Sequence, residues 1–150
     1  DASISPWMDE SIATLVSKLI EGEFGGAGTY HAIHALNSAV EKASGSVRTC
    51  GFNELMLPVA EDDELKRLAS RGQIDLRFLV SAISVCVAGL DMVLLPLSTP
   101  DKKLTELLLD LFSIAQRRKK ALGVRILLAD EMPGRWVKMG RFGNIPVMSI

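Results

Sequence analysis

Segments with a helical repeat of apolar residues alternate with short, continuously apolar segments along this chain. The first pattern predicts amphipathic helices, and the second predicts strands that are buried on both faces. The predicted order is helix (12–20), helix (29–44), strand (54–59), helix (61–71), helix (75–83), strand (91–96), helix (100–122), strand (124–129) and a tail with a last short strand (146–148). This alternation predicts an α/β fold with mainly parallel strands.

Polar residues of the types that cap helices stand at several of the predicted helix starts. Asp9 or Ser11 precedes the first helix, Thr29 the second and Asp75 the fourth. These residues accept hydrogen bonds from the unpaired amides of a first helical turn. Thr99, followed by a proline, is the expected cap of the longest helix, because proline suits the first helical position.

The strands at 91–96 and 124–129 flank the longest amphipathic helix of the chain. A strand, a long helix and a second strand form a crossover unit, whose two strands pair in parallel. The apolar stripe of this helix is expected to face the core, and Leu108 and Leu111 belong to it. An antiparallel pairing of the two strands would contradict the interpretation.

Composition narrows the classes of protein to which the chain can belong. It has 150 residues, 48% of them hydrophobic, and a formal net charge of −1. The length suits one domain, and the lack of a basic excess argues against a nucleic-acid partner. No uncharged apolar run of about 18 residues occurs, so no membrane span is expected. Two cysteines and no signal-peptide pattern favour the reducing cytoplasm.

A glycine-rich loop at residues 22–28 precedes the second helix. Amides at a helix start can hold an anion, which makes Gly26, Gly28 and Thr29 candidate anion-binding residues. The spacing does not match a dinucleotide-binding fingerprint, and no buried strand precedes the loop. The alternative is a tight connection between two helices.

The two histidines, His31 and His34, share one face of the second helix. Imidazoles at this spacing can ligate a metal, but the sequence places no third ligand beside them. We therefore predict no metal site, and no motif identifies a cofactor.

Four residues lie at or beside predicted strand ends and carry groups that can do chemistry. Glu61 and Asp62 follow the strand at 54–59, Cys86 precedes the strand at 91–96, and Asp91 starts that strand. Ligand sites of α/β sheets form at the carboxyl ends of strands, so these residues are the candidate catalytic set. The alternatives are acids that stabilise a helix start and a buried, inert thiol.

Four stretches together resemble one family. They are residues 28–40, which end in Ala-Leu-Asn-Ser-Ala-Val; residues 57–62; residues 84–92, with Ser-Val-Cys-Val-Ala-Gly-Leu-Asp-Met; and residues 124–125 with the tail 145–148. In this order and spacing they are similar to the "PFL family protein" family, the domain-of-unknown-function family 711. The resemblance covers nearly the whole chain.

The resemblance implies a fold like the α/β barrel of pyruvate formate-lyase-like glycyl radical enzymes. Members of the family are longer, and this chain resembles their C-terminal third. Two departures from related patterns matter. Residues 97–99 read Leu-Ser-Thr where family members tend to have Gly-Asp-Thr, and residues 135–142 lack the radical motif Arg-Val-x-Gly-aromatic. We therefore expect no radical on Gly140.

Two hypotheses of different classes remain. The first is a small-molecule or catalytic site at the strand ends. The second is a non-catalytic structural or regulatory subunit that packs on the rest of a barrel or on a second copy. A cut barrel exposes sheet edges and apolar helix faces, so we expect an interface larger than the roughly 1,000 Å² of a specific contact. The chain does not begin with Met, which favours a piece of a longer polypeptide.

Overall fold

The computed structural model describes residues 1–87 and 90–150 of the chain. In chain order its elements are α1 (Ile12–Ile20), α2 (Thr29–Ser44), η1 (Val59–Glu61), α3 (Asp63–Ser70), α4 (Leu76–Ala82), β1 (Val93–Pro96), α5 (Asp101–Arg118), β2 (Ile126–Ala129), β3 (Trp136–Lys138), η2 (Gly140–Phe142) and β4 (Asn144–Pro146). The mixed α/β composition agrees with the sequence pattern.

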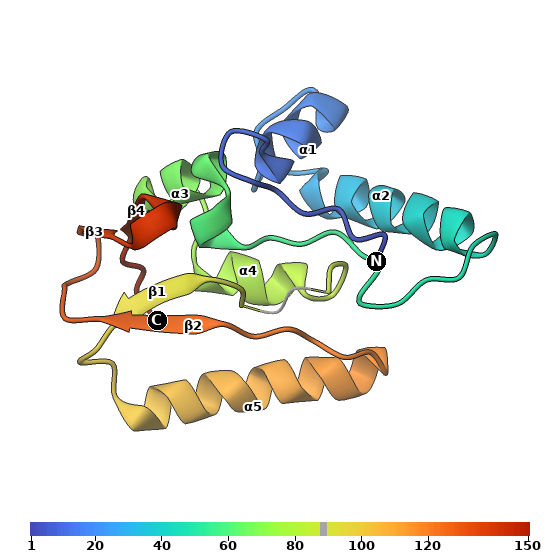
Figure 1. Cartoon of the computed structure of the whole chain (residues 1–150). Helices are drawn as coiled ribbons and strands as arrows, with labels where there is room; N and C mark the ends of the chain where they lie inside the picture. Colours follow the sequence, from blue (N-terminus) through green and yellow to red (C-terminus); the bar gives the residue numbers. More distant parts are fainter. Residues whose placement is uncertain (88–89) are drawn as a thin grey trace.

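The predicted crossover unit is confirmed. Strands β1 and β2 pair in parallel, with Val93 opposite Ile126 and Pro96 opposite Ala129. Helix α5 connects them and lies along one side of the pair (Figure 1). On its other edge, β1 forms a single parallel bridge between Leu94 and Val147. Strand β1 is therefore central, and β2 lies at an edge of the described sheet.

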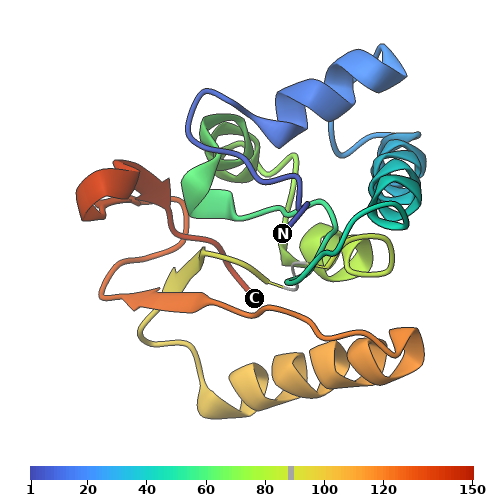
Figure 2. The same cartoon turned by 45° about the vertical axis from the view of Figure 1, so that its right-hand side comes forward.

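Helices cover both sides of the β1–β2 pair. Helix α5 lies on one side, and α1 to α4 lie on the other in both views (Figures 1 and 2). The main core contains apolar residues from both layers, including Ile33 of α2, Leu65 of α3, Val93 of β1 and Leu111 of α5. A smaller core lies between β1 and the C-terminal hairpin of β3 and β4, where Leu94 packs near Ile145.

The stripe of α5 is narrower than the sequence suggests. Leu107 and Leu111 are buried, as expected for Leu111, but Leu108 is 49% exposed and Phe112 is 60% exposed. The prediction that Leu108 is buried is therefore wrong. The physical reason is that the sheet covers only one flank of α5. No described element packs on the flank that carries Leu108 and Phe112.

The segment at 54–59 does not form the expected ladder strand. Leu55 makes one isolated parallel bridge with Ile4, and Val59 already begins the short helix η1. The amide of Val59 donates to the carbonyl of Asp91 at 3.0 Å, which docks the segment at the start of β1. Pro58 has no amide to donate, which works against a longer ladder.

Four of the helix starts had caps expected from the sequence, and the structure agrees at two of them. Ser11 and Asp75 cap α1 and α4, since their side chains accept from the amides of Thr14 and Phe78. The residue at the cap of α2 is Gly28 rather than Thr29, with a φ of 93° that favours glycine. Helix α5 has Pro100 as its cap residue, one position later than expected.

The described residues, 1–87 and 90–150, do not form a closed barrel, so the barrel likeness stays a prediction. Two residues of the family-like stretch at 84–92, Ala88 and Gly89, lie outside the described residues. Within the described part, no helix is long and apolar enough to cross a membrane.

Candidate functional site

Two of the four candidate catalytic residues meet through an arginine that the sequence did not single out for chemistry. The guanidinium of Arg125 binds both carboxylate oxygens of Asp91, with Nη2 2.9 Å from Oδ2, and Nη2 lies 3.1 Å from Oε1 of Glu61. The hydrogen bond to Asp91 is the main cause that raises the pKa of Arg125. The arrangement is an ion-pair cluster in which one cation pairs with two acids.

This cluster lies at the amino end of the parallel sheet. Asp91 precedes β1 and Arg125 precedes β2, and parallel strands start at the same end. The expectation that Asp91 joins a site at the carboxyl ends of the strands is therefore wrong. Glu61 reaches the cluster because residues 54–59 run toward the start of β1, where Val59 is bonded to Asp91.

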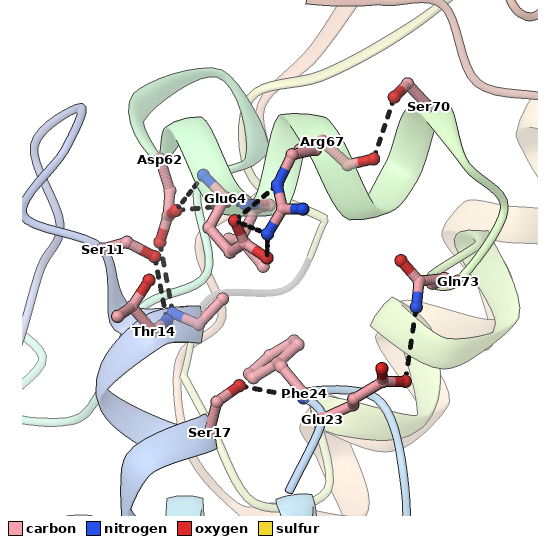
Figure 3. A network of polar contacts seen from close by, with 12 residues as sticks. Ser11, Thr14, Ser17, Glu23, Phe24, Asp62, Glu64, Arg67, Ser70 and Gln73 are labelled. Atoms are coloured by element: carbon pink, nitrogen blue, oxygen red, sulfur yellow. Dashed lines mark hydrogen bonds and ion pairs between the residues drawn. The ribbon is translucent and has the colours of Figure 1, made fainter.

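Asp62 is fully buried and joins the starts of two helices (Figure 3). Its Oδ1 accepts from the amides of Glu64 at 2.9 Å and Leu65 at 3.1 Å, at the start of α3. Its Oδ2 accepts from the amides of Ile12 at 2.9 Å and Ala13 at 3.4 Å, at the start of α1. A carboxylate with four amide donors at two positive helix ends has a structural role.

Cys86 contributes to a different part of the fold. It is fully buried in the main core, and its carbonyl accepts from Arg118 at the end of α5. Arg118 in turn pairs with the buried Glu54, at 2.9 Å between Nη2 and Oε2, and Lys120 binds the same carboxylate. The structure thus brings together Glu61 and Asp91, but it gives Asp62 and Cys86 separate surroundings.

The glycine loop is closed by its own hydrogen bonds. The Thr29 hydroxyl accepts from the amide of Gly25 at 3.0 Å, the amide of Gly26 donates to Glu23, and the amide of Thr29 donates to Gly26. Two of the amides expected to hold an anion already have acceptors, which supports the tight-connection alternative. Gly28 supplies the positive φ at which α2 begins.

His31 and His34 are both exposed on α2. In the described parts of the chain, no group of three or more His, Cys, Asp or Glu side chains is arranged to hold a metal ion.

Exposed apolar side chains occur on both α5 and β2, and we call this set of residues the α5–β2 face. On α5 it includes Leu108, Leu109 and Phe112, which are 49%, 58% and 60% exposed. On β2 it includes Leu128, which is 45% exposed. The sequence led us to expect uncovered apolar helix faces but did not place them on α5, because an apolar stripe on a helix does not reveal how much of its width another element covers.

The family model described as Uncharacterised ACR (DUF711) matches residues 1–139 of this chain. Curated relatives, each named a UPF0210 protein, are similar over nearly the whole chain. The relative from Lacticaseibacillus casei (strain BL23) is 32% identical over 150 residues, which is 97% of this chain and 32% of the relative. The relative from Sulfurisphaera tokodaii is 30% identical over 149 residues, 97% of this chain and 34% of the relative.

A third relative, from Pelobacter propionicus, is 33% identical over 150 residues, which is 97% of this chain and 33% of the relative. The chain thus spans about a third of the length of the curated relatives it matches. No solved structure is significantly similar to it. Because the family model covers most of its length, the chain belongs to the DUF711/UPF0210 family, which is described as uncharacterised.

Proposed function

We propose that this chain is a packing module of a larger DUF711/UPF0210 protein, and that the α5–β2 face is covered by another part of the family-length polypeptide. The observation that carries the proposal is the exposure of adjoining large apolar side chains on α5. Phe112 lies four residues after Leu108 and three after Leu109, so the three side chains share one helix flank. Soluble monomers rarely expose contiguous apolar patches of this kind.

The flank of α5 that carries Leu108, Leu109 and Phe112 faces away from the rest of the described fold. The opposite flank of α5, with Lys103, Glu106 and Asp110, lines a hollow together with Leu76 and Val80 of α4. By helical spacing, Leu108 and Phe112 point away from α4.

The edge of β2 supports the same proposal. Within residues 1–87 and 90–150, β2 pairs with β1 alone, so its other edge carries unpaired backbone groups. An open edge of apolar residues such as Leu127 and Leu128 invites another strand. In a family-length protein a further strand would extend the sheet here. Such an extension fits our proposal that this chain is the C-terminal third of a pyruvate formate-lyase-like barrel.

The length of the relatives indicates what covers the α5–β2 face. About two thirds of each curated relative lies outside the match, so a family-length chain has ample sequence to cover the face. The Glu61–Arg125–Asp91 cluster favours packing over catalysis, because each acid is already engaged by the arginine.

Hydrogen–deuterium exchange tests the proposal. We would compare the isolated chain with a chimera in which it replaces the matching third of the L. casei relative. Amides of residues 124–129 should exchange at least about tenfold more slowly in the chimera, because a covered strand edge opens less often. Equal exchange in the two proteins would contradict the proposal.

A pair of double variants sharpens the test. Leu108→Lys with Phe112→Lys should lower the melting temperature of the chimera and leave that of the isolated chain nearly unchanged. Leu15→Lys with Leu19→Lys, which alters exposed leucines of α1, is the matched control and should change neither. If the isolated chain instead sediments as a dimer that the first pair dissociates, a second copy is the occupant and the proposal is wrong in this form.

A further inference from the structure

A hollow of about 410 Å³ opens between α1, residues 22–24 and α3. Figure 3 shows side chains around it, with Thr14 and Ser17 on the α1 side, Arg67 on the α3 side, and Gln73 with Glu23 closing one end. Its volume lies within the range of small-molecule sites. It lies on the helical layer opposite α5, so it is separate from the α5–β2 face (Figure 2).

Two helices direct hydrogen-bond donors toward this hollow. Thr14, Ser17 and Lys18 follow one another at the spacing of one helix face on α1, and all three line the hollow. Arg67 and Arg71, four residues apart, line it from α3 and its C-terminal cap position. Residues with hydroxyl, ammonium and guanidinium groups therefore line the hollow from both helices.

Two of these cations are not paired with an acid. Arg67 is held by Glu64, with Nε 2.8 Å from Oε2, and this hydrogen bond raises the pKa of the guanidinium. Lys18 and Arg71 make no ion pair with a carboxylate anywhere in the described ranges 1–87 and 90–150. The other acid at the hollow, Glu23, accepts a hydrogen bond from Gln73 at 3.5 Å. The lining thus carries three cations and two acids, a net charge of +1.

The other lining residues indicate which further atoms a ligand of this hollow would need. The Ser17 hydroxyl accepts from the amide of Phe24 at 3.0 Å, so its own proton stays available for a donor contact. Phe24 and Leu68, which are 2% and 4% exposed, form an apolar floor. A ligand that fits would combine an anionic head with a small body that has both apolar and hydrogen-bonding atoms.

We propose that this hollow, named here the α1–α3 hollow, binds a small phosphomonoester whose phosphate bridges Lys18 and Arg71. A phosphate has three terminal oxygens, so it can contact a lysine on one wall and an arginine on the other while it accepts from a hydroxyl. A carboxylate has only two oxygens and satisfies one guanidinium in a bidentate pair. The phosphate of such an ester is close to doubly charged at neutral pH, which matches two unpaired cations.

Calorimetric titration of the whole chain tests this proposal with ribose 5-phosphate as the probe. We expect saturable binding that inorganic phosphate competes away, and no binding of ribose. Lys18→Gln and Arg71→Gln should each weaken binding about tenfold, as expected for the loss of one charge-assisted contact. Lys42→Gln and Arg117→Gln, which remove exposed cations of the same types outside the hollow, are the matched controls and should bind as the unchanged chain does.

Three results would overturn the proposal: no saturable binding of either phosphate probe at millimolar concentrations, equal weakening by the control variants, or tighter binding of succinate than of ribose 5-phosphate. Thermal unfolding of every variant shows whether a loss of binding comes from a loss of folding. If Lys18→Gln unfolds the chain, Arg71→Gln alone decides the matter, since Arg71 lies just after the last turn of α3.

Discussion

Asp62 offers the sharpest test of how this fold is held together. Its carboxylate is fully buried and accepts from four backbone amides at the starts of α1 and α3. Asp62→Ala removes the acceptor for all four donors at once. The loss of an N-cap destabilises a protein by about 1 kcal/mol, and here two helix starts are affected. Buried amides left without acceptors add about 1–3 kcal/mol, so we expect a total of about 4 kcal/mol.

Two further variants should destabilise the chain less than Asp62→Ala does. Asp62→Asn keeps the shape and one accepting oxygen but turns an amide group toward two donors, so we expect about 2 kcal/mol. Asp75→Ala is the matched control, because Asp75 caps α4 through a single bond of 2.8 Å to the amide of Phe78 at an exposed position. It should cost about 1 kcal/mol.

Urea unfolding followed by circular dichroism measures these free energies of unfolding. The reasoning requires the order Asp62→Ala, then Asp62→Asn, then Asp75→Ala, from the largest loss to the smallest. If Asp62→Ala destabilises the chain no more than Asp75→Ala does, the double cap is not what holds α1 against α3.

Three other predictions concern the core, the ion-pair cluster and the tail. Leu111→Ala should lower the free energy of unfolding in urea by about 2–5 kcal/mol, and Leu108→Ala by less than about 1 kcal/mol, because only Leu111 is buried. Similar losses for the two variants would contradict the packing of α5 described above. Arg125→Gln should lower the free energy of unfolding by about 1–2 kcal/mol in the same assay, because the negative charges of Asp91 and Glu61 lose their partner cation. The loss is no larger because solvent screens this half-exposed guanidinium. An unchanged urea midpoint would show that the cluster does not stabilise the fold. We expect no radical on Gly140, and an electron paramagnetic resonance doublet that disappears in Gly140→Ala would show otherwise.

The crossover unit could be read from the sequence because its signals are local and strong. Strands β1 and β2 are continuously apolar, and the helix between them has a clear 3.6-residue period, so parallel pairing follows from chain connectivity. The caps at Ser11 and Asp75 are local for the same reason, since each side chain bonds an amide three residues on. Of the hairpin of β3 and β4, the sequence indicated only a last strand at 146–148, which overlaps β4 at Pro146. It missed β3 and the pairing, because strands of three residues carry too little pattern.

The long-range features were decided by tertiary structure. Arg125 meets Glu61 and Asp91 across 64 and 34 positions of the chain, and no spacing rule connects residues so far apart. Asp62 stands at the start of α3, as the sequence suggests for an acid, but its second helix comes from residues 50 positions earlier. The α1–α3 hollow likewise exists only because two helices far apart in the chain face one another.

The sequence by itself determined the order of the main elements, the parallel crossover and the family resemblance, because periodicity, capping and motif order are properties of short segments. Tertiary structure alone decided which apolar positions of α5 are covered and which acids share a cation. Burial depends on how much of a helix its neighbours reach, and an ion pair depends on where distant backbone segments bring their side chains. Leu108 and Leu111 illustrate the difference, since both lie on one apolar stripe and only Leu111 is in the core.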